Sequence, residues 1–326
     1  MYLVIDVGGT FIKNCIMSRN GDIVCKGESV PTPYSCSWGM KDVQKGIDAF
    51  LEAIYGIYAG FKDSYDIKGI AMSMPGQIDV DNGIVYGGGA LPYLDGERVG
   101  DLISRKCDGI SVAIENDGKC AALAEVWQGN GKDCRDVVVI VFGTGIGGGI
   151  VIDRKILHGR GMVAGEMSFI FENVTRENLY DIVPLDDNRE GFELPKDSIW
   201  SMQASVMSIC NKVADLKGIP QSEVDGKLVY RLEEEDAEVH EILERWYLNI
   251  AKHCMNMHVL LAPDMILLGG GISAQPKFIE GVKKYVRILS KFSVIYNEMN
   301  IGLCKFGNDS NMIGALFNYL QKYEGE

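Results

Sequence analysis

The amino-acid sequence predicts an α/β fold in which one domain occurs twice. The first observation is a repeated unit of strand, glycine-rich turn, strand, turn and strand, found at residues 2–27 and again at residues 137–159. Two copies of one unit in separate halves of a chain are typical of an internal duplication. The second observation is the length, because 326 residues suffice for two domains of ordinary size.

Apolar runs bounded by turn residues predict the strands, and apolar residues at helical spacing predict the helices. Strands are expected at residues 2–5, 11–17, 23–25, 67–74, 84–86, 112–114, 137–142, 150–152, 156–157 and 264–268. Helices are expected at residues 40–61, 118–127, 199–214, 237–262, 275–289 and 314–321. The polar stretch at residues 173–196 is expected to form an extended surface loop.

The first glycine turn carries residue types that suit a phosphate. Gly8 and Gly9 allow the backbone to wrap around an anion, and the Thr10 hydroxyl can donate a hydrogen bond to it. Asp6 can hold a metal-bound water, and Lys13 adds positive charge on the returning strand. On these residues alone, an ordinary glycine hairpin without a ligand is an equal alternative.

The strand at residues 112–114 leads directly into Glu115, Asn116 and Asp117, and a helix rich in alanine follows. A carboxylate where a strand meets a helix is in the usual position for a catalytic or ligand-binding residue in an α/β protein. The alternative is that Asp117 only caps the helix, because aspartate is among the best N-cap residues. For a lone aspartate, capping is the favoured interpretation.

The second glycine turn is denser, because five of the seven residues from Gly143 to Gly149 are glycine. Such a run, with Thr144 and Gly145 at its start, allows backbone N–H groups to approach an anion closely. A dinucleotide fingerprint through Gly143, Gly145 and Gly148 would need a helix directly after the glycines, but a strand, a turn and a strand follow. We therefore expect a phosphate-gripping hairpin, with a hairpin that binds nothing as the alternative.

A third cluster, Gly269, Gly270 and Gly271, follows a strand and precedes a helix. A junction of this kind suits a nucleoside or its phosphates. Gly76 follows the strand at residues 67–74 and can let the backbone approach a polyol, or it can be a connector. The glycines at residues 87–89 are interpreted as structural.

Composition excludes several classes of protein. The net charge of −13 disfavours nucleic acid and anionic membrane surfaces as partners. No apolar run is long enough to span a membrane, and the first residues do not resemble a signal peptide, so we expect a cytoplasmic protein.

Nine scattered cysteines without a CxxC pair indicate reduced thiols and no zinc site. The acidic run at residues 233–236 is interpreted as a solvated helix face, and His240, His253 and His258 as core residues rather than metal ligands.

Together these residues resemble the ROK family of sugar kinases. The matching motifs are Asp6-Val7-Gly8-Gly9-Thr10 with Lys13, Glu115-Asn116-Asp117 with Ala121, residues 143–149, Gly165-Glu166, and Gly269 to Ser273. The resemblance runs from residue 2 to about residue 316. It implies an actin-like, ribonuclease-H-like duplicated α/β fold with a cleft between two domains, which binds ATP, Mg²⁺ and a sugar.

The resemblance also implies a role for each matching residue. Asp117 would be the general base, Asn116 and Glu166 would hold sugar hydroxyls, and Gly76 would lie beside the sugar. We expect one domain at residues 1–116 and a larger one at residues 117–309, with a C-terminal helix at about residues 310–326 that packs back on the first. A homodimer is expected.

One departure from the family bears on the substrate. The family continues Gly-Glu-x-Gly-His and then has a cysteine-rich zinc loop, whereas here Phe169 replaces the histidine and residues 170–200 contain neither Cys nor His. The glutamate expected from that loop has no clear match near residues 199–205. The chain thereby resembles the family's β-glucoside kinases, which lack the zinc motif. Neither the structural zinc nor the histidine contact to the sugar is expected.

The resemblance therefore implies an ATP-dependent kinase that phosphorylates the 6-hydroxyl of a hexose, in a β-glucoside such as cellobiose or gentiobiose. Phe169 and aromatic residues up to Trp200 could stack on a second sugar ring. Alternatively, Phe169 is a core residue and the enzyme is a glucokinase or another hexose kinase. A sugar-sensing regulator of the same family is disfavoured because no helix-turn-helix precedes the first strand, and a catalytically silent sugar-binding protein because Asp117 and the glycine turns are intact.

Overall fold

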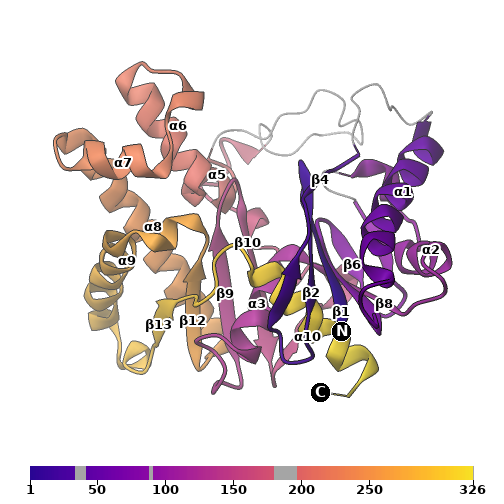
Figure 1. Cartoon of the computed structure of the whole chain (residues 1–326). Helices are drawn as coiled ribbons and strands as arrows, with labels where there is room; N and C mark the ends of the chain where they lie inside the picture. The colour runs from indigo at the N-terminus through magenta and orange to yellow at the C-terminus, as the bar shows by residue number, and fades with distance from the viewer. Residues whose placement is uncertain (34–41, 88–90, 180–196, 326) are drawn as a thin grey trace. The chain divides into compact units, whose positions relative to one another are not determined.

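The structure is a computed structural model that describes residues 1–33, 42–87, 91–179 and 197–325 (Figure 1). It divides into two compact units: unit 1 comprises residues 1–133, 149–164 and 308–326, and unit 2 comprises residues 134–148 and 165–307. The expected boundary between residues 116 and 117 falls inside unit 1. The reason is that helix α3 (Asp117–Trp127) packs along the C-terminal helix α10 (Ser310–Tyr323), which belongs to the same unit.

Unit 1 is built on a six-stranded sheet with the order β3-β2-β1-β5-β8, in which β4 also pairs with β2. Strands β1, β5 and β8 run parallel, and β2 is antiparallel to β1 and β3. The elements of unit 1 are β1 (Tyr2–Val7), β2 (Phe11–Met17), β3 (Ile23–Lys26), β4 (Val30–Pro31), α1 (Val43–Lys62), β5 (Gly69–Met74), the β6 and β7 hairpin (Gln77–Asp79, Ile84–Tyr86), α2 (Val99–Lys106), β8 (Val112–Asn116), α3, β11 (Lys155–Ile156) and α10.

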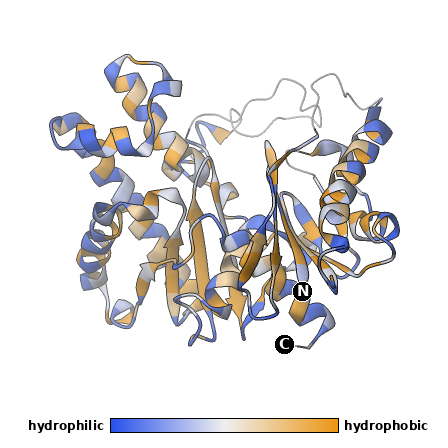
Figure 2. Cartoon of the chain, in the orientation of Figure 1, coloured by the Kyte–Doolittle hydropathy of each residue, from blue (hydrophilic) through white to orange (hydrophobic). Residues whose placement is uncertain are grey.

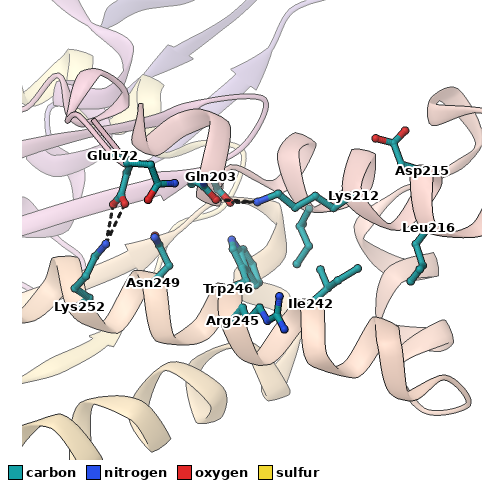
Figure 3. A pocket seen from close by; sticks show the side chains of 12 residues that line it. Glu172, Gln203, Lys212, Asp215, Leu216, Ile242, Arg245, Trp246, Asn249 and Lys252 are labelled. Carbon is teal, nitrogen blue, oxygen red and sulfur yellow. Dashed lines mark hydrogen bonds and ion pairs between the residues drawn. The ribbon is translucent and has the colours of Figure 1, made fainter. Parts of the chain in front are cut away.

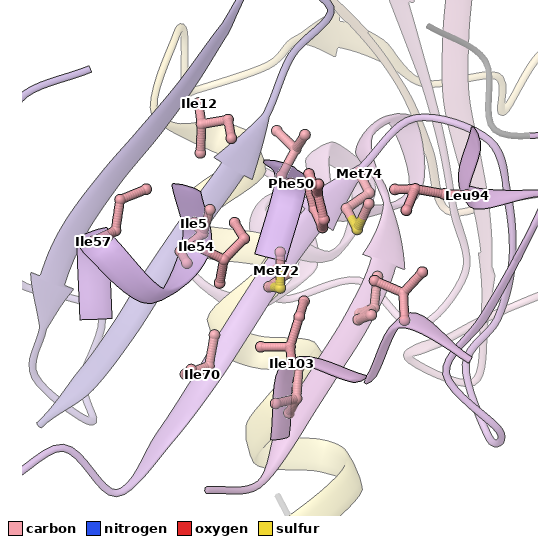
Figure 4. Close-up of a cluster of buried hydrophobic side chains, with 14 of the residues drawn as sticks. Ile5, Ile12, Phe50, Ile54, Ile57, Ile70, Met72, Met74, Leu94 and Ile103 are labelled. Carbon is pink, nitrogen blue, oxygen red and sulfur yellow. The ribbon is translucent and has the colours of Figure 1, made fainter. Parts of the chain in front are cut away.

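The central strands of this sheet are apolar on both faces because helices cover both. Alternate residues of a strand point to opposite faces. Ile5, Ile70 and Met72 pack against helices α1 and α2 in one cluster of buried side chains (Figure 4). Helices α3 and α10 cover the other face. Continuous apolar strands of this kind are typical of parallel strands buried between two helical layers.

Unit 2 contains most of a five-stranded sheet with the order β11-β10-β9-β12-β13, in which β12 is parallel to β9 and to β13. Strand β10 carries the chain from unit 2 into unit 1, where its last residues pair with β11. The elements are β9 (Val137–Phe142), β10 (Ile146–Ile152), α5 (Trp200–Ala204), α6 (Val206–Lys217), α7 (Gly226–Glu233), α8 (Ala237–Leu261), β12 (Met265–Gly269), α9 (Pro276–Leu289) and β13 (Ile301–Leu303).

The two sheets have the same plan, which confirms the predicted duplication. In each, two strands joined by a glycine turn are followed by two parallel strands, β1-β2 with β5 and β8, and β9-β10 with β12 and β13. Figure 2 shows apolar residues concentrated in the strands and polar residues on the outer faces of the helices. None of the described helices is long and apolar enough to cross a membrane.

Several expected elements differ from the structure. The helix expected at residues 199–214 is two helices, α5 and α6, because Ser205 has an extended backbone and its side chain caps α6 by accepting a hydrogen bond from Ser208 N. Helices α2 and α7 were not predicted. Residues 88–90 and 180–196 of the expected loops lie outside the described residues.

Two further interpretations concern helix α8. The acidic run is not a helix face, because α7 ends at Glu233 and Asp236 is the N-cap of α8. Of the three histidines on α8, His253 alone is buried in the core, whereas the side chain of His240 is half exposed.

Candidate active site

Most of the predicted site residues lie at or directly after the carboxyl ends of parallel strands, whereas Lys13 lies on the antiparallel strand β2 and Glu166 on a turn before a 3-10 helix. Unit 1 holds Asp6, Gly8, Gly9, Thr10, Lys13, Gly76, Asn116 and Asp117, and unit 2 holds Gly143, Thr144, Gly145, Glu166, Gly269, Gly270 and Gly271. In sheets of this class, ligands bind at that edge.

Polar side chains line one face of the first sheet at this edge. Asp6 on β1, Ser73 on β5 and Glu115 on β8 are neighbours in the strand register, so they share one face of the sheet. All three are buried. Buried polar groups persist where hydrogen bonds or a function compensate for lost hydration. The row therefore makes this edge of unit 1 the candidate site.

Asp117 is the first residue of helix α3 and is exposed. Its Oδ1 accepts a hydrogen bond from Gly118 N at 2.8 Å. The N-cap of the helix is Asn116, whose Oδ1 accepts from Lys119 N at 3.2 Å. The alternative interpretation, in which Asp117 is the N-cap, is therefore wrong.

Asn116 connects this helix to the loop after β5. Its Nδ2 donates to Gly76 O at 3.0 Å, and Gly76 has a φ of 104°, in the region that favours glycine. The structure thus brings Gly76, Asn116 and Asp117 together. An asparagine side chain has two N–H donors and two acceptor lone pairs, so one of each is left beyond these two bonds.

Glu115 and His158 form a pair that sequence reasoning did not single out. The Glu115 carboxylate is 1% exposed; its Oε1 accepts from Asn116 N at 2.7 Å, and its Oε2 lies 2.7 Å from His158 Nε2. A glutamate at the end of an apolar strand is a signal, because a buried carboxylate requires partners. The identity of the partner, 43 residues further along the chain, could not be read from spacing.

The first glycine turn is tight and exposes its tip. Gly8 N donates to Phe11 O at 3.0 Å, which leaves Gly9 and Thr10 exposed. Asp6 lies directly opposite Lys13 on the neighbouring strand, with 3.8 Å between Oδ2 and Nζ. The second oxygen of Asp6, Oδ1, accepts from Asn311 Nδ2 at 3.2 Å.

The Asp6 carboxylate at this strand end fits a magnesium ion held through water. Mg²⁺ keeps several waters and takes one or two carboxylates together with substrate phosphates, so a dedicated protein cage is not required. Within the described ranges, no group of three or more His, Cys, Asp or Glu side chains could hold a metal.

Two of the three glycine clusters meet at one cavity of unit 2. This cavity of about 650 Å³ is lined by Gly143 and Thr144 from the β9–β10 turn, by Gly271 after β12, and by apolar side chains. The apolar side chains are Phe142, Val206, Met207, Val224, Ile272 and Ala274, and the polar ones are Asn211, Gln221, Ser222, Asp225, Lys227 and Gln275. A cavity with both apolar and polar side chains and with exposed backbone at its edge suits a purine base and its phosphates.

The glycines at and near this cavity differ in whether packing within the protein explains why the residue is glycine. A Cβ at Gly270 would lie 2.0 Å from Phe142 O, and one at Gly269 would lie 2.7 Å from Cys304 Sγ, so internal packing explains both residues. A Cβ at Gly143 or Gly271 would meet no atom within 4 Å. Close packing within the protein therefore does not explain glycine at these two positions, which leaves the backbone there open to a ligand.

A second cavity of unit 2, of about 620 Å³, contains none of the predicted site residues (Figure 3). Its cations lie near carboxylates. Lys252 Nζ is 3.0 Å from both oxygens of Glu172. Lys212 Nζ is 3.8 Å from Asp197 Oδ1, and Arg245 Nε is 2.7 Å from Glu241 Oε1. Burial by itself raises the pKa of Glu172, but hydrogen bonds from His253 and Lys252 outweigh it and hold that pKa below its usual value. The cavity therefore lacks uncompensated positive charge for a nucleotide.

Glu166 and Phe169 lie on one short turn. Glu166 is half buried and is the N-cap of the 3-10 helix η4 (Met167–Phe169), and Phe169 N donates to Glu166 O at 3.2 Å. The Phe169 side chain is 65% exposed, so its interpretation as a core residue is wrong. Trp200, in contrast, is fully buried and packs on His253 with 4.3 Å between ring centroids. Its faces are not available to a second sugar ring.

Known proteins are similar to this chain over nearly its whole length. The model of the ROK family matches residues 2–322. A β-glucoside kinase of Listeria monocytogenes is 27% identical over 318 residues, which cover 97% of this chain and 96% of that protein.

Two solved structures extend the likeness to the fold. A ROK family protein from Streptococcus pneumoniae, in complex with sucrose, has a TM-score of 0.79 and 28% identity, covering 100% of this chain and 99% of that one. A ROK family glucokinase from Streptomyces griseus, in complex with glucose and AMPPNP, has a TM-score of 0.74 at 21% identity, covering 97% of each chain; at this identity the likeness is one of fold alone. The predicted actin-like, ribonuclease-H-like α/β fold is confirmed.

Proposed function

This chain belongs to the ROK family, and on that basis we propose that it is an ATP-dependent sugar kinase whose acceptor is a β-linked glucoside, phosphorylated on the 6-hydroxyl of its glucosyl unit. The relative from Listeria monocytogenes is named a β-glucoside kinase, and the similar structure from Streptococcus pneumoniae holds a disaccharide, sucrose. Both support an acceptor larger than one hexose.

The observation that carries this specificity is the exposed ring of Phe169. Phe169 is the last residue of the short 3-10 helix that begins directly after Glu166, and its backbone N–H donates to Glu166 O at 3.2 Å, so the two residues lie on one turn. If Glu166 holds the hydroxyls of one sugar ring, Phe169 offers an apolar face to whatever is linked to that ring. Sugar rings have apolar C–H faces that pack on aromatic side chains, and a β-linked group would gain that contact.

Asp117 would supply the chemistry on the acceptor. Its carboxylate would accept the proton of the attacking hydroxyl as the oxygen–phosphorus bond forms and the bond to the ADP oxygen breaks. The remaining N–H and lone pair of Asn116 would bind neighbouring hydroxyls, and Gly76 would present its backbone to the same ring. Positioning and charge neutralisation account for most of the rate in phosphoryl transfer, so one well-placed base suffices.

The glycine turns would bind ATP. In unit 1, the backbone of Gly8 and Gly9 and the Thr10 hydroxyl would donate to phosphate oxygens, with Lys13 adding positive charge. In unit 2, the cavity that contains Gly143, Thr144 and Gly271 would take the base and the nearby phosphates. Asp6 would hold Mg²⁺ through water, and the ion, when bound, supplies neutralisation of phosphate charge.

The test is release of ADP with a panel of acceptors. Purified protein with ATP and Mg²⁺ is given glucose, cellobiose, gentiobiose or no sugar, and kcat/KM is measured for each. We expect a higher kcat/KM for a β-linked disaccharide than for glucose, and a product phosphorylated at the 6-position by phosphorus NMR. A clear preference for glucose would replace the proposal with a glucokinase, and no sugar-dependent turnover would overturn it.

A further inference from the structure

We propose that Glu115 and His158 are positioning residues, which hold the strand end and the first helical turn so that Asp117 is aligned for proton transfer. This inference rests on the proposed function. It starts from the burial of Glu115, whose carboxylate is 1% exposed at the end of a strand that is otherwise apolar. Burying a carboxylate is costly unless hydrogen bonds compensate it, so a carboxylate in this place indicates a role beyond packing.

Each oxygen of Glu115 has a defined partner. Oε1 accepts the backbone N–H of Asn116 at 2.7 Å, and Oε2 lies 2.7 Å from His158 Nε2. A carboxylate can only accept hydrogen bonds, so with Glu115 in its carboxylate form His158 Nε2 is the donor of this pair. Charge-assisted bonds of this length are about twice as strong as neutral ones, and they fix the carboxylate on both sides.

The hydrogen bond from Asn116 N to Glu115 Oε1 fixes the backbone directly before Asp117. The side chain of Asn116 caps helix α3 through Lys119 N and also binds Gly76 O at 3.0 Å. Asp117 is the next residue, the first of that helix. A continuous set of hydrogen bonds thus runs from His158 through Glu115 to Asn116, and it determines where the helix starts. The position of the Asp117 carboxylate depends on that starting point.

His158 is itself held firmly by the backbone on both sides. Leu157 N donates to Ile150 O at 2.8 Å, and Ala164 N donates to the carbonyl oxygen of His158 at 3.1 Å. Gly159 follows with a φ of 66°, a conformation that strongly favours glycine. The imidazole is 29% exposed, so it reaches the buried Glu115 from the edge of unit 1. The backbone at His158 is thus fixed, and the ring itself is held by its contact with Glu115 Oε2.

Removing the imidazole N–H should therefore affect the chemical step more than binding. His158 has no assigned contact with either substrate, so KM for sugar and for ATP should change by no more than about twofold. A displacement of about 1 Å at the reacting group can cost on the order of 100-fold in rate, and we expect a loss of kcat of about that size. An equal loss in kcat and in kcat/KM is typical of an interaction made in the transition state.

The experiment compares His158→Phe, which keeps a ring but has no donor, with His158→Gln, which restores an N–H donor of similar reach. The matched control is His240→Phe, because His240 Nδ1 makes a similar pair with Glu233 Oε1 at 3.0 Å but has no proposed role. For each purified variant we would measure kcat, both KM values and the thermal unfolding midpoint. We expect kcat to fall in His158→Phe, to recover by at least tenfold in His158→Gln, and to stay at the wild-type value in His240→Phe.

Three results would overturn the inference: an unchanged kcat in His158→Phe, a loss seen only in KM, or no recovery in His158→Gln. If His158→Phe does not fold, His158→Ala takes its place, and added imidazole should then restore kcat; a failure of imidazole to do so counts against the inference. A wild-type protein that phosphorylates no sugar would instead remove the proposed function. The two failures are distinguishable because the second is seen before any variant is made.

Discussion

Replacing Phe169 with alanine tests the proposed specificity, because it removes the aromatic face and leaves Glu166 in place. Complete burial of a phenylalanine side chain is worth about 1.5–3 kcal/mol. Since 65% of the side chain is exposed and a sugar ring covers one of its two faces, roughly a third of that, about 0.5–1 kcal/mol, is available to a β-linked group. This corresponds to a loss of about two- to fivefold in kcat/KM for gentiobiose, with no change for glucose.

The assay is coupled ADP release with gentiobiose and glucose under identical conditions. Phe292→Ala is the matched control, because Phe292 is 88% exposed in unit 2 and has no proposed contact with a sugar. Truncation of an exposed side chain should change the free energy of unfolding by less than about 0.5 kcal/mol. An equal loss for both sugars, or no loss for either, would refute the reasoning that Phe169 contacts the group linked to the glucosyl ring.

The glycine turn after β12, the metal requirement and the Glu172 cluster each give a further prediction. Gly270→Ala should lower the free energy of unfolding in urea by about 2–4 kcal/mol, because of its positive φ and the contact with Phe142 O. Gly271→Ala should instead leave unfolding unchanged and raise the KM for ATP. A zinc chelator should leave activity intact when Mg²⁺ is in excess, whereas removal of Mg²⁺ should abolish it; stoichiometric zinc in the purified protein would contradict this. Burial raises the pKa of Glu172, but hydrogen bonds from His253 and Lys252 hold it below its usual value. The ionised Glu172 therefore stabilises the fold above the ordinary carboxyl pKa, and this stabilisation is lost as the pH falls through the lower pKa of the folded state. The urea midpoint should therefore fall more steeply between about pH 5 and pH 3 in the wild type than in Glu172→Gln.

Local patterns in the sequence were sufficient for most of the strands and for the duplication, whereas β4, β6 and β13 were not predicted. The predicted strands at residues 11–17, 84–86 and 137–142 coincide with β2, β7 and β9. The last two are apolar runs with a turn residue at both ends. The break at Ser205 was missed, since a serine inside an apolar helical pattern gives no sign that it will cap a second helix.

Tertiary contacts determine what the sequence could not predict about the site. Glycines 269–271 look alike in the sequence, yet packing against Phe142 and Cys304 explains two of them and not the third. The exposure of Phe169 and the burial of Trp200 depend on elements far away in the chain, such as helix α8 for Trp200. The pairing of His158 with Glu115 has the same origin.

The most direct test of the central claim is the sugar-dependent turnover of Asp117→Asn. The amide keeps an oxygen that can accept from Gly118 N, so the helix start and the thermal unfolding midpoint should be preserved. Loss of a general base typically costs about 10²–10⁴-fold, and we expect kcat to fall by that factor while ATP binding, measured by calorimetry, is retained. Near-normal turnover with sugar in this variant would contradict the assignment of Asp117 as the base.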